Sequence, residues 1–122
     1  MKTHNREILI YYHPESSSDR QTVAMAQGMS SYVRSYAYGK TPSTETSWKS
    51  IMHALNCHPK DLLNKSHPYY QIHIKGREFD EESWVKILRF NPDMIRVPIA
   101  ICGRRVVLCN TPSDIHRLFD GN

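Results

Sequence analysis

Apolar and β-branched residues open the chain in a strand–helix–strand order. Residues 8–12 form a continuous apolar run, which is typical of a buried strand. The serines and the aspartate at 16–19 are good helix N-caps, and the helix that they predict reaches about Gly28. Residues 31–38 are rich in aromatic and β-branched side chains and predict a second strand. Two strands joined through a helix are expected to be parallel.

The middle of the chain shows helical periodicity. A helix capped by Thr44 carries four apolar residues at the spacing of one amphipathic face, namely Trp48, Ile51, Met52 and Leu55. Pro59 opens a short helix through residues 60–63, and Asp80 is the N-cap of another helix that ends before Asn91. Residues 69–79 fit neither the strand pattern nor the helix pattern.

Two short apolar strands and a helix complete the pattern. Residues 98–102 and 106–109 flank a glycine–arginine turn, which predicts a hairpin. Thr111 caps a last helix that Pro112 opens. The element order predicts one α/β domain over residues 1–122, with a mixed four-stranded sheet (β-α-β, then β-β-α) and a helical insertion at about 44–91.

Composition and charge then narrow the function classes. The 122 residues are 39% hydrophobic and 23% charged, and the net charge is +4 with a pI near 9.1. The basic residues are scattered, so we do not expect nucleic-acid binding. No apolar stretch approaches the ~18 residues of a membrane helix, and residues 1–7 lack a signal-peptide core. With three cysteines and no C-x-x-C pair, we expect a cytoplasmic protein with reduced thiols.

Four segments match the motifs of one known family in order and spacing. The segments lie at 11–16 (Tyr-Tyr-His-Pro-Glu-Ser), 40–45 (Lys-Thr-Pro-Ser-Thr-Glu), 61–65 (Asp-Leu-Leu-Asn-Lys) and 91–99 (Asn-Pro to Pro-Ile). Through them the chain resembles the arsenate reductase (ArsC)/Spx-like family, whose motifs read Y-x-N-P-x-C, K-T-P-x-T-E, D-L-L-R-K and N-P…R-P-I. The resemblance implies a thioredoxin-like, glutaredoxin-like fold with a helical insertion. It also implies that Pro98 is a cis-proline that faces the loop of His13, Pro14, Asp19 and Arg20.

The chain departs from that family where its chemistry needs a thiolate. Ser16 stands at the position of the family's redox cysteine, and Asp19 stands where Spx-like members have a second cysteine. A serine cannot form a disulfide, so thiol–disulfide exchange is excluded from this loop. The arginine positions that hold the oxyanion are also changed, to Asn64, Val97 and Asn110, while Arg20 keeps its place and Arg96 lies one residue off.

Two other roles for the serine loop follow from its residue types. Ser16 becomes a nucleophile only if a base activates it, and His13 is the nearest candidate. We favour instead a capping role, in which one of the three serines accepts hydrogen bonds from free helix N–H groups. An anion site formed by Ser16, Ser17, Ser18 and Arg20 at the helix N-terminus is a separate hypothesis.

The remaining cysteines and histidines offer little further chemistry. Cys102 and Cys109 lie on predicted buried strands, where cysteine acts as a small core residue. Cys57 follows a helix end beside His58, with His53 at helical spacing. The histidines follow no zinc-binding spacing, so we expect no metal.

These observations favour a pseudoenzyme. We expect a binding or regulatory protein that has lost arsenate reductase and thiol-redox activity, that has no cofactor and that works through another protein. The alternative is a glutathione-linked or thiol oxidoreductase, similar to arsenate reductase, with a non-standard site; glutathione is a cofactor only in that case. The fold alone does not choose between them.

Overall fold

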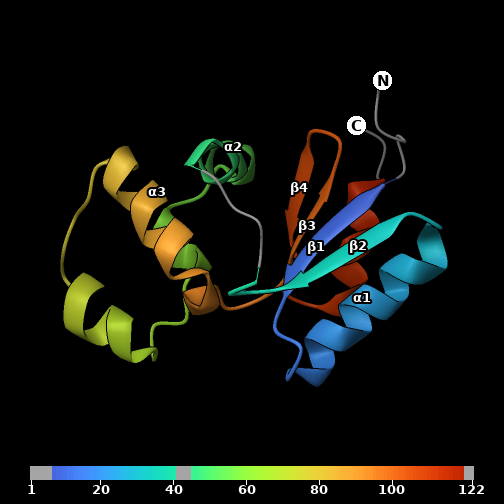
Figure 1. Ribbon diagram of the computed structural model, residues 1–122, viewed down its shortest axis with the longest axis horizontal. Helices are drawn as coiled ribbons and strands as arrows, with labels where there is room; N and C mark the ends of the chain where they lie inside the picture. Colours follow the sequence, from blue (N-terminus) through green and yellow to red (C-terminus); the bar gives the residue numbers. More distant parts are fainter. Residues whose placement is uncertain (1–6, 41–44, 120–122) are drawn as a thin grey trace. The chain divides into compact units, whose positions relative to one another are not determined.

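The computed structural model describes residues 7–40 and 45–119, and it divides the chain into two compact units (Figure 1). One unit joins Met1–Thr41 to Val97–Asn122 and contains the sheet; we call it the sheet unit. The other, Pro42–Arg96, is the helical unit. The helical unit contains the insertion expected at about 44–91. The expected cap Thr44 lies outside the described residues.

The sheet unit is built on four strands in the order β2-β1-β3-β4. β1 (Ile8–Tyr12) pairs in parallel with β2 (Val33–Ala37), and it pairs in antiparallel fashion with β3 (Ile99–Cys102). β3 continues through a hairpin into β4 (Arg105–Leu108). Gly103 has φ +62 in the hairpin turn, a backbone conformation that glycine adopts without steric cost. The predicted mixed four-stranded sheet is confirmed.

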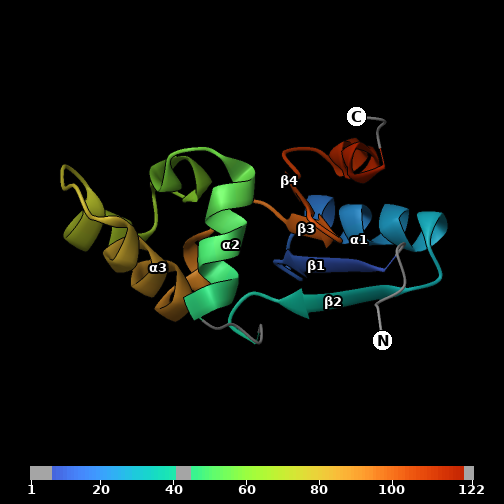
Figure 2. The ribbon, with the colours of Figure 1, turned by 90° about the horizontal axis from the view of Figure 1, so that it is seen from above.

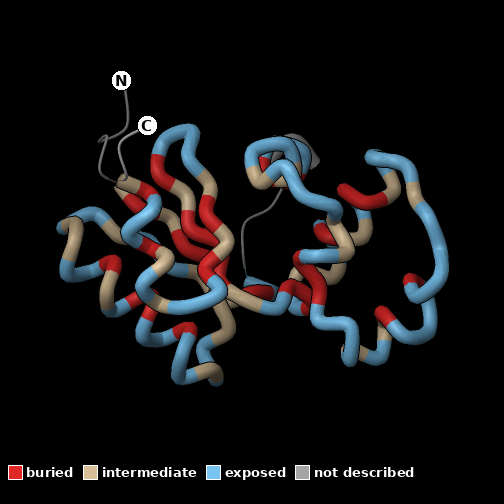
Figure 3. Tube along the Cα trace, turned by 180° about the vertical axis from the view of Figure 1, so that it is seen from behind, coloured by how far each residue is buried: buried red, intermediate tan, exposed pale blue. Residues whose placement is uncertain are grey.

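Two helices cover one face of this sheet and enclose the core. α1 (Ser17–Met29) and η4 (Pro112–Leu118) contact each other and lie on the same side of the strands (Figure 2). The alternation of side chains along a strand sends every second residue to that side. The resulting core consists of buried strand and helix residues (Figure 3), namely Ile8, Ile10, Val23, Ala26, Ala100, Cys102, Val107, Cys109, Ile115 and Leu118.

The helical unit has its own apolar interior. It contains α2 (Glu45–Leu55), η1 (Pro59–Leu62), η2 (Tyr70–Ile74), α3 (Glu81–Phe90) and η3 (Pro92–Met94). Trp48, Leu62, Leu88 and Met94 are almost completely buried there. The predicted cap of α3 is confirmed, because the Asp80 carboxylate accepts the Ser83 N–H at 2.8 Å. Among the described residues, no helix combines the length and the apolar character needed to cross a membrane.

Three local expectations need correction or completion. η4 is a 3-10 helix, whose three-residue turn brings Ile115 and Leu118 to the same side, toward the core. The unassigned stretch at 69–79 contains η2, one turn of π-helix, which has the period of neither strand nor α-helix.

The third correction concerns Pro98, which is not a cis-proline. No peptide bond within 7–40 and 45–119 is cis. The trans bond is the intrinsically favoured isomer. In this arrangement the Val97 carbonyl accepts the Tyr38 hydroxyl at 2.9 Å, and the Pro98 carbonyl accepts the Cys109 N–H at 2.9 Å.

Candidate functional site

The loop between β1 and α1 holds the serine at the family's cysteine position. Ser16 has extended backbone angles, φ −88 and ψ 123, and its side-chain oxygen accepts the Asp19 N–H at 3.1 Å. Its carbonyl accepts the Arg20 N–H at 3.0 Å, which is the first hydrogen bond of α1. Ser16 is therefore the N-cap, as the sequence predicted for one of the three serines.

Asp19 completes this cap from the first turn of α1. Its side chain is 4% exposed, and its two carboxylate oxygens have different donors. The Ser16 hydroxyl donates to Oδ1 at 3.2 Å, and the His13 backbone N–H donates to Oδ2 at 2.9 Å. A carboxylate is also favoured at a helix N-terminus by the helix dipole. The position that corresponds to the second cysteine of the Spx-like motif is thus occupied by a buried carboxylate with hydrogen-bond donors on both oxygens.

His13 is not arranged as a base for Ser16. Among the described residues, both hydrogen bonds of the Ser16 hydroxyl go to Asp19. The His13 ring lies 4.7 Å from the Tyr38 ring, and its Nδ1 lies 3.7 Å from a Glu15 carboxylate oxygen. The pairing of nucleophile and base that serine catalysis needs is not formed in this loop.

Arg20 and the two remaining serines lie on the exposed side of the loop. The Arg20 guanidinium donates to the Pro14 carbonyl at 2.8 Å and so ties the loop to the first turn of α1. Ser17 and Ser18 are exposed. The anion site expected from Ser16, Ser17, Ser18 and Arg20 stays a prediction, and Asp19 already supplies a negative charge to the same helix end.

Behind the loop, the sheet unit disfavours further negative charge. Burial raises the pKa of Tyr38 well above its usual value, and the charge of Asp19 raises this pKa further. Burial also raises the pKa of the Cys109 thiol to about 12, with Asp114 and Asp19 adding to the rise. Neither group ionises at neutral pH. Tyr38 is anchored instead as a neutral hydrogen-bond donor to Val97.

Asn64, at one of the family's arginine positions, and Arg96, next to another, form hydrogen bonds to the local backbone. Asn64 closes a turn, since its side-chain oxygen accepts the Ser66 N–H at 3.0 Å. The Arg96 guanidinium donates to the Asp61 carbonyl at 2.9 Å within the helical unit. Val97 has an apolar side chain, and Asn110 is exposed two residues after β4. These interactions serve the local backbone rather than an oxyanion.

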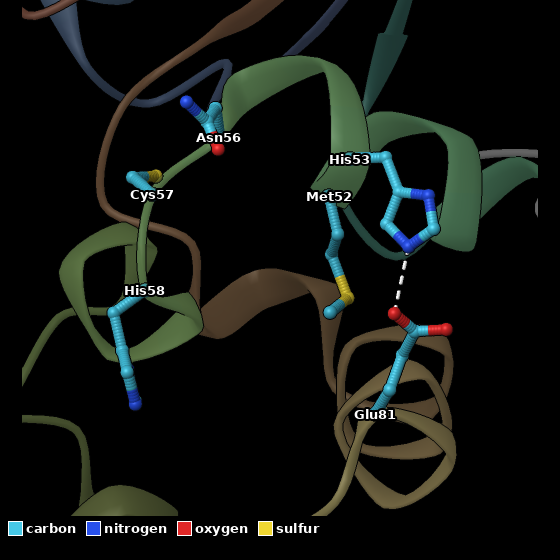
Figure 4. Close-up of a pocket in the computed structure, with 6 residues that line it drawn as sticks. All are labelled: Met52, His53, Asn56, Cys57, His58 and Glu81. Atoms are coloured by element: carbon cyan, nitrogen blue, oxygen red, sulfur yellow. Dashed lines mark hydrogen bonds and ion pairs between the residues drawn. The ribbon is translucent and has the colours of Figure 1, made fainter.

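A second group of residues, most of them polar, lines a depression of about 470 Å³ in the helical unit (Figure 4). His53, Cys57 and His58, which the sequence singled out, all line it, together with Met52, Asn56 and Glu81. His53 Nε2 lies 2.7 Å from the Glu81 carboxylate, which links α2 to α3. Within residues 7–40 and 45–119, no three side chains of His, Cys, Asp or Glu are placed so that they could hold a metal ion together.

The thiol in this depression is not activated. Burial raises the pKa of Cys57, Asp61 raises it further, and Arg96 lowers it. The His58 ring Nδ1 accepts the Lys60 N–H at 3.1 Å, and the ring packs edge-on against Trp84 at 5.9 Å between centroids. Sequence reasoning missed Glu81 in this group, and it named Asp19 only as a candidate N-cap, not as the hydrogen-bond partner of Ser16 and of the His13 N–H. An S-x-x-D capping pattern was the available signal for Asp19.

Comparison with known proteins agrees with this architecture. The sequence model of the ArsC family matches residues 11–118. An arsenate reductase from Vibrio cholerae has a TM-score of 0.81 at 16% identity, covering 93% of this chain and 98% of that chain. A candidate arsenate reductase from Yersinia pestis has a TM-score of 0.78 at 18% identity, covering 91% and 99%.

A third structure, an arsenate reductase (ArsC) related protein from Brucella melitensis, has a TM-score of 0.62 at 13% identity and covers 98% of this chain and 100% of that chain. No curated protein matches the sequence. At these identities the structures establish a shared thioredoxin-like fold.

Proposed function

Since the chain belongs to the ArsC family, we propose that it is a member without arsenate reductase or thiol-redox activity, which acts as a binding or regulatory module for another protein. The observation that carries this proposal is the Ser16–Asp19 pair. The two positions of the C-x-x-C motif in Spx-like relatives are occupied by a hydroxyl and a carboxylate that hydrogen-bond to each other. This pair caps α1 and contains no redox centre.

The chemistry of the remaining thiols supports the same conclusion. The nucleophile in disulfide exchange is a thiolate, so a reactive cysteine needs a lowered pKa. The pKa of Cys57 is raised, and that of Cys109 is raised to about 12. Cys102 is buried on β3. Arg96 near Cys57 and Arg117 near Cys109 lower these pKa values, but burial and the neighbouring carboxylates outweigh them, so neither thiol has the lowered pKa of a reactive cysteine.

The loss of arginines also weakens the binding of an oxyanion. Arsenate is a tetrahedral oxyanion, which guanidinium groups hold through paired charge-assisted hydrogen bonds. Asn64, Val97 and Asn110 replace arginines of the family, and Arg20 donates to the Pro14 carbonyl. We infer that the substrate site and the redox site were lost together while the fold was retained. A cytoplasmic location and the lack of a cofactor belong to this proposal.

Intact-protein mass spectrometry tests the loss of redox chemistry. After incubation with arsenate, reduced glutathione and then mild oxidant, we expect the protein to show no adduct of arsenic and no internal disulfide. The Cys57→Ser variant is the matched control, because it removes the exposed thiol. An adduct present in the native protein and absent in Cys57→Ser would contradict the proposal by placing redox chemistry at Cys57.

The binding half of the proposal is tested by affinity capture from the native cell. We expect a protein partner to be recovered in stoichiometric amount with the native chain and with Cys57→Ser alike. Recovery of the chain alone, at native concentration, would contradict a binding role.

A further inference from the structure

The sheet of the sheet unit has a second face, which α1 and η4 do not cover. Side chains alternate between faces, and strand register determines which residues share a face. Leu9 pairs with Ile101, which pairs with Val106, while α1 and η4 pack against the alternate residues such as Ile10 and Ala100. The second face therefore consists of Leu9, Tyr11, Arg34, Tyr36, Ile99, Ile101, Val106 and Leu108.

This second face has the composition of an interior surface. Arg34 is its one charged member; the others are aliphatic or aromatic. Tyr11 and Ile99 are buried, but Leu9, Ile101 and Val106 remain partly exposed. A sheet face that stays in water normally carries polar residues at these positions. An apolar sheet face is normally covered by another layer of structure.

The area and charge of the face disfavour a stable dimer, and the length of its strands fits a short helical segment. Four strands of four or five residues span roughly 19 Å by 15 Å, or about 300 Å². Two such faces stacked together would bury about half of the ~1,200 Å² at the lower end of stable interfaces. A net charge of +4 on each copy also opposes self-association. A helix of about ten residues is ~15 Å long and matches the strands in length.

The positive charges beside the second face indicate that a partner would carry acidic side chains. The Arg34 side chain is 69% exposed on the edge strand β2, and its Nε lies 3.3 Å from the Glu7 carboxylate. A guanidinium has five N–H donors, so Arg34 binds a second carboxylate without giving up Glu7. Arg104 is exposed in the β3–β4 turn, at the opposite edge of the sheet. Acidic side chains beside an apolar stripe would complement this surface.

We propose that the second face docks an amphipathic helix of a partner protein, with its apolar stripe on Leu9, Ile101 and Val106 and with acidic side chains toward Arg34. The helix packs as a third layer, opposite α1 and η4. This inference rests on the proposed binding role and names the surface and the partner class for it.

A titration of the full-length, methyl-labelled protein with a model helix tests this inference. The probe is a fourteen-residue peptide with leucines along one helical face and glutamates on the others; the matched control peptide has lysine in place of each glutamate. We expect the glutamate peptide to shift the methyl signals of Leu9, Ile101, Val106 and Leu108. The methyl signals of Ile72, which is 67% exposed in the helical unit, are expected to stay in place.

Two substitutions make the test specific. Val106→Glu is expected to weaken the binding of the glutamate peptide at least tenfold. Ile72→Glu, also an apolar-to-acid change, is expected to leave the affinity for this peptide unchanged. If Val106→Glu does not fold, Arg34→Glu serves instead. This charge reversal at an exposed position is expected to weaken the binding of the glutamate peptide several-fold and to strengthen the binding of the lysine peptide.

The following outcomes overturn the docking inference. The first is equal binding of the two peptides. The second is a shift of methyl signals outside the second face, or no shift with either peptide. The third is a shift of the second-face methyl signals that depends on protein concentration in the absence of peptide, which would indicate a second copy as the occupant. Each of these results leaves the loss of redox chemistry untouched, because that claim is tested by mass and by turnover rather than by peptide binding.

Discussion

Two hydrogen bonds join the Ser16 hydroxyl to Asp19, three residues later, at the start of α1: one to the backbone N–H of Asp19 and one to its carboxylate. Ser16 Oγ accepts the Asp19 N–H at 3.1 Å and donates to Asp19 Oδ1 at 3.2 Å. The Spx-like C-x-x-C motif, to which the sequence was compared, has two thiols at the same spacing. Here the spacing holds a cap, with the other carboxylate oxygen bound to the His13 N–H. The pair therefore stabilises the loop between β1 and α1.

Removal of either partner should destabilise the protein. Ser16→Ala removes the N-cap, which costs about 1 kcal/mol of unfolding free energy. Asp19→Ala leaves the His13 N–H without its acceptor and costs about 2 kcal/mol. The double variant should lose less than the sum, because the two residues share hydrogen bonds. Urea unfolding followed by circular dichroism measures these changes, with Ser17→Ala, at an exposed position, as the matched control.

Additive losses in the double variant, or a loss in Ser17→Ala as large as in Ser16→Ala, would show that the pair is not the cap described here.

A thiol introduced at position 16 should be restrained by Asp19. The N-terminus of α1 lowers the pKa of a thiol there, but the neighbouring carboxylate raises it. In a Cys57→Ala background, Ser16→Cys combined with Asp19→Asn should therefore react about tenfold faster with iodoacetamide at pH 7 than Ser16→Cys alone. The pH dependence of the alkylation rate gives both pKa values. Equal rates in the two variants would refute a charge effect of Asp19 on this position.

Stability should fall at alkaline pH because of Cys109. Burial raises the pKa of this thiol from 9.0 to about 12, so the folded protein holds the proton that the unfolded chain releases. The contribution is fully present below pH 9 and is lost as pH rises toward 12, up to about 4 kcal/mol. Tyr38, whose pKa is also raised, adds to the loss above pH 10.

Chemical unfolding at pH 7, 9 and 10.5 measures this dependence. Cys109→Ala should be less stable at pH 7 but should show a shallower decline above pH 9, with the Tyr38 contribution left in place. The same decline in Cys109→Ala as in the native protein would rule out the buried thiol as its source.

Thiol accessibility should separate the three cysteines. Cys57 is exposed, while Cys102 and Cys109 are buried, so an aromatic disulfide reagent should label Cys57 first in the native protein. The raised pKa of Cys57 makes this reaction slower than that of a free thiol at pH 7. Absorbance during labelling of the native protein and of Cys57→Ser measures it. Fast labelling that persists in Cys57→Ser would contradict the burial of the other two thiols.

Much of the fold could be predicted because local patterns and tertiary packing agree there. The continuous run at β1 was recognised as a strand because Ile8, Ile10 and Tyr11 are apolar or aromatic and buried, and Asp80 caps α3 through the neighbouring Ser83 N–H. The helix at Trp48 and Ile51 was readable because its buried side chains recur at the helical period. These signals lie within a few residues of the element that they define.

The parts that sequence reasoning missed depend on contacts that are distant along the chain or on local backbone choice. Asp19 takes its second donor from His13, six residues earlier and outside the helix. His53 meets Glu81 across 28 positions. The cis bond before Pro98 was implied by the family resemblance and is not found, and the π-turn at η2 has a period that matches neither the strand pattern nor the α-helix pattern.

The central claim is that this member of the ArsC family does not turn over arsenate, and steady-state kinetics tests it most directly. The measurement is arsenate-dependent NADPH oxidation with glutathione, glutaredoxin and glutathione reductase, with the Vibrio cholerae arsenate reductase as the positive control. We predict that the native protein and Ser16→Ala give the same rate as the mixture without either protein. Turnover by the native protein that is lost in Ser16→Ala would contradict it.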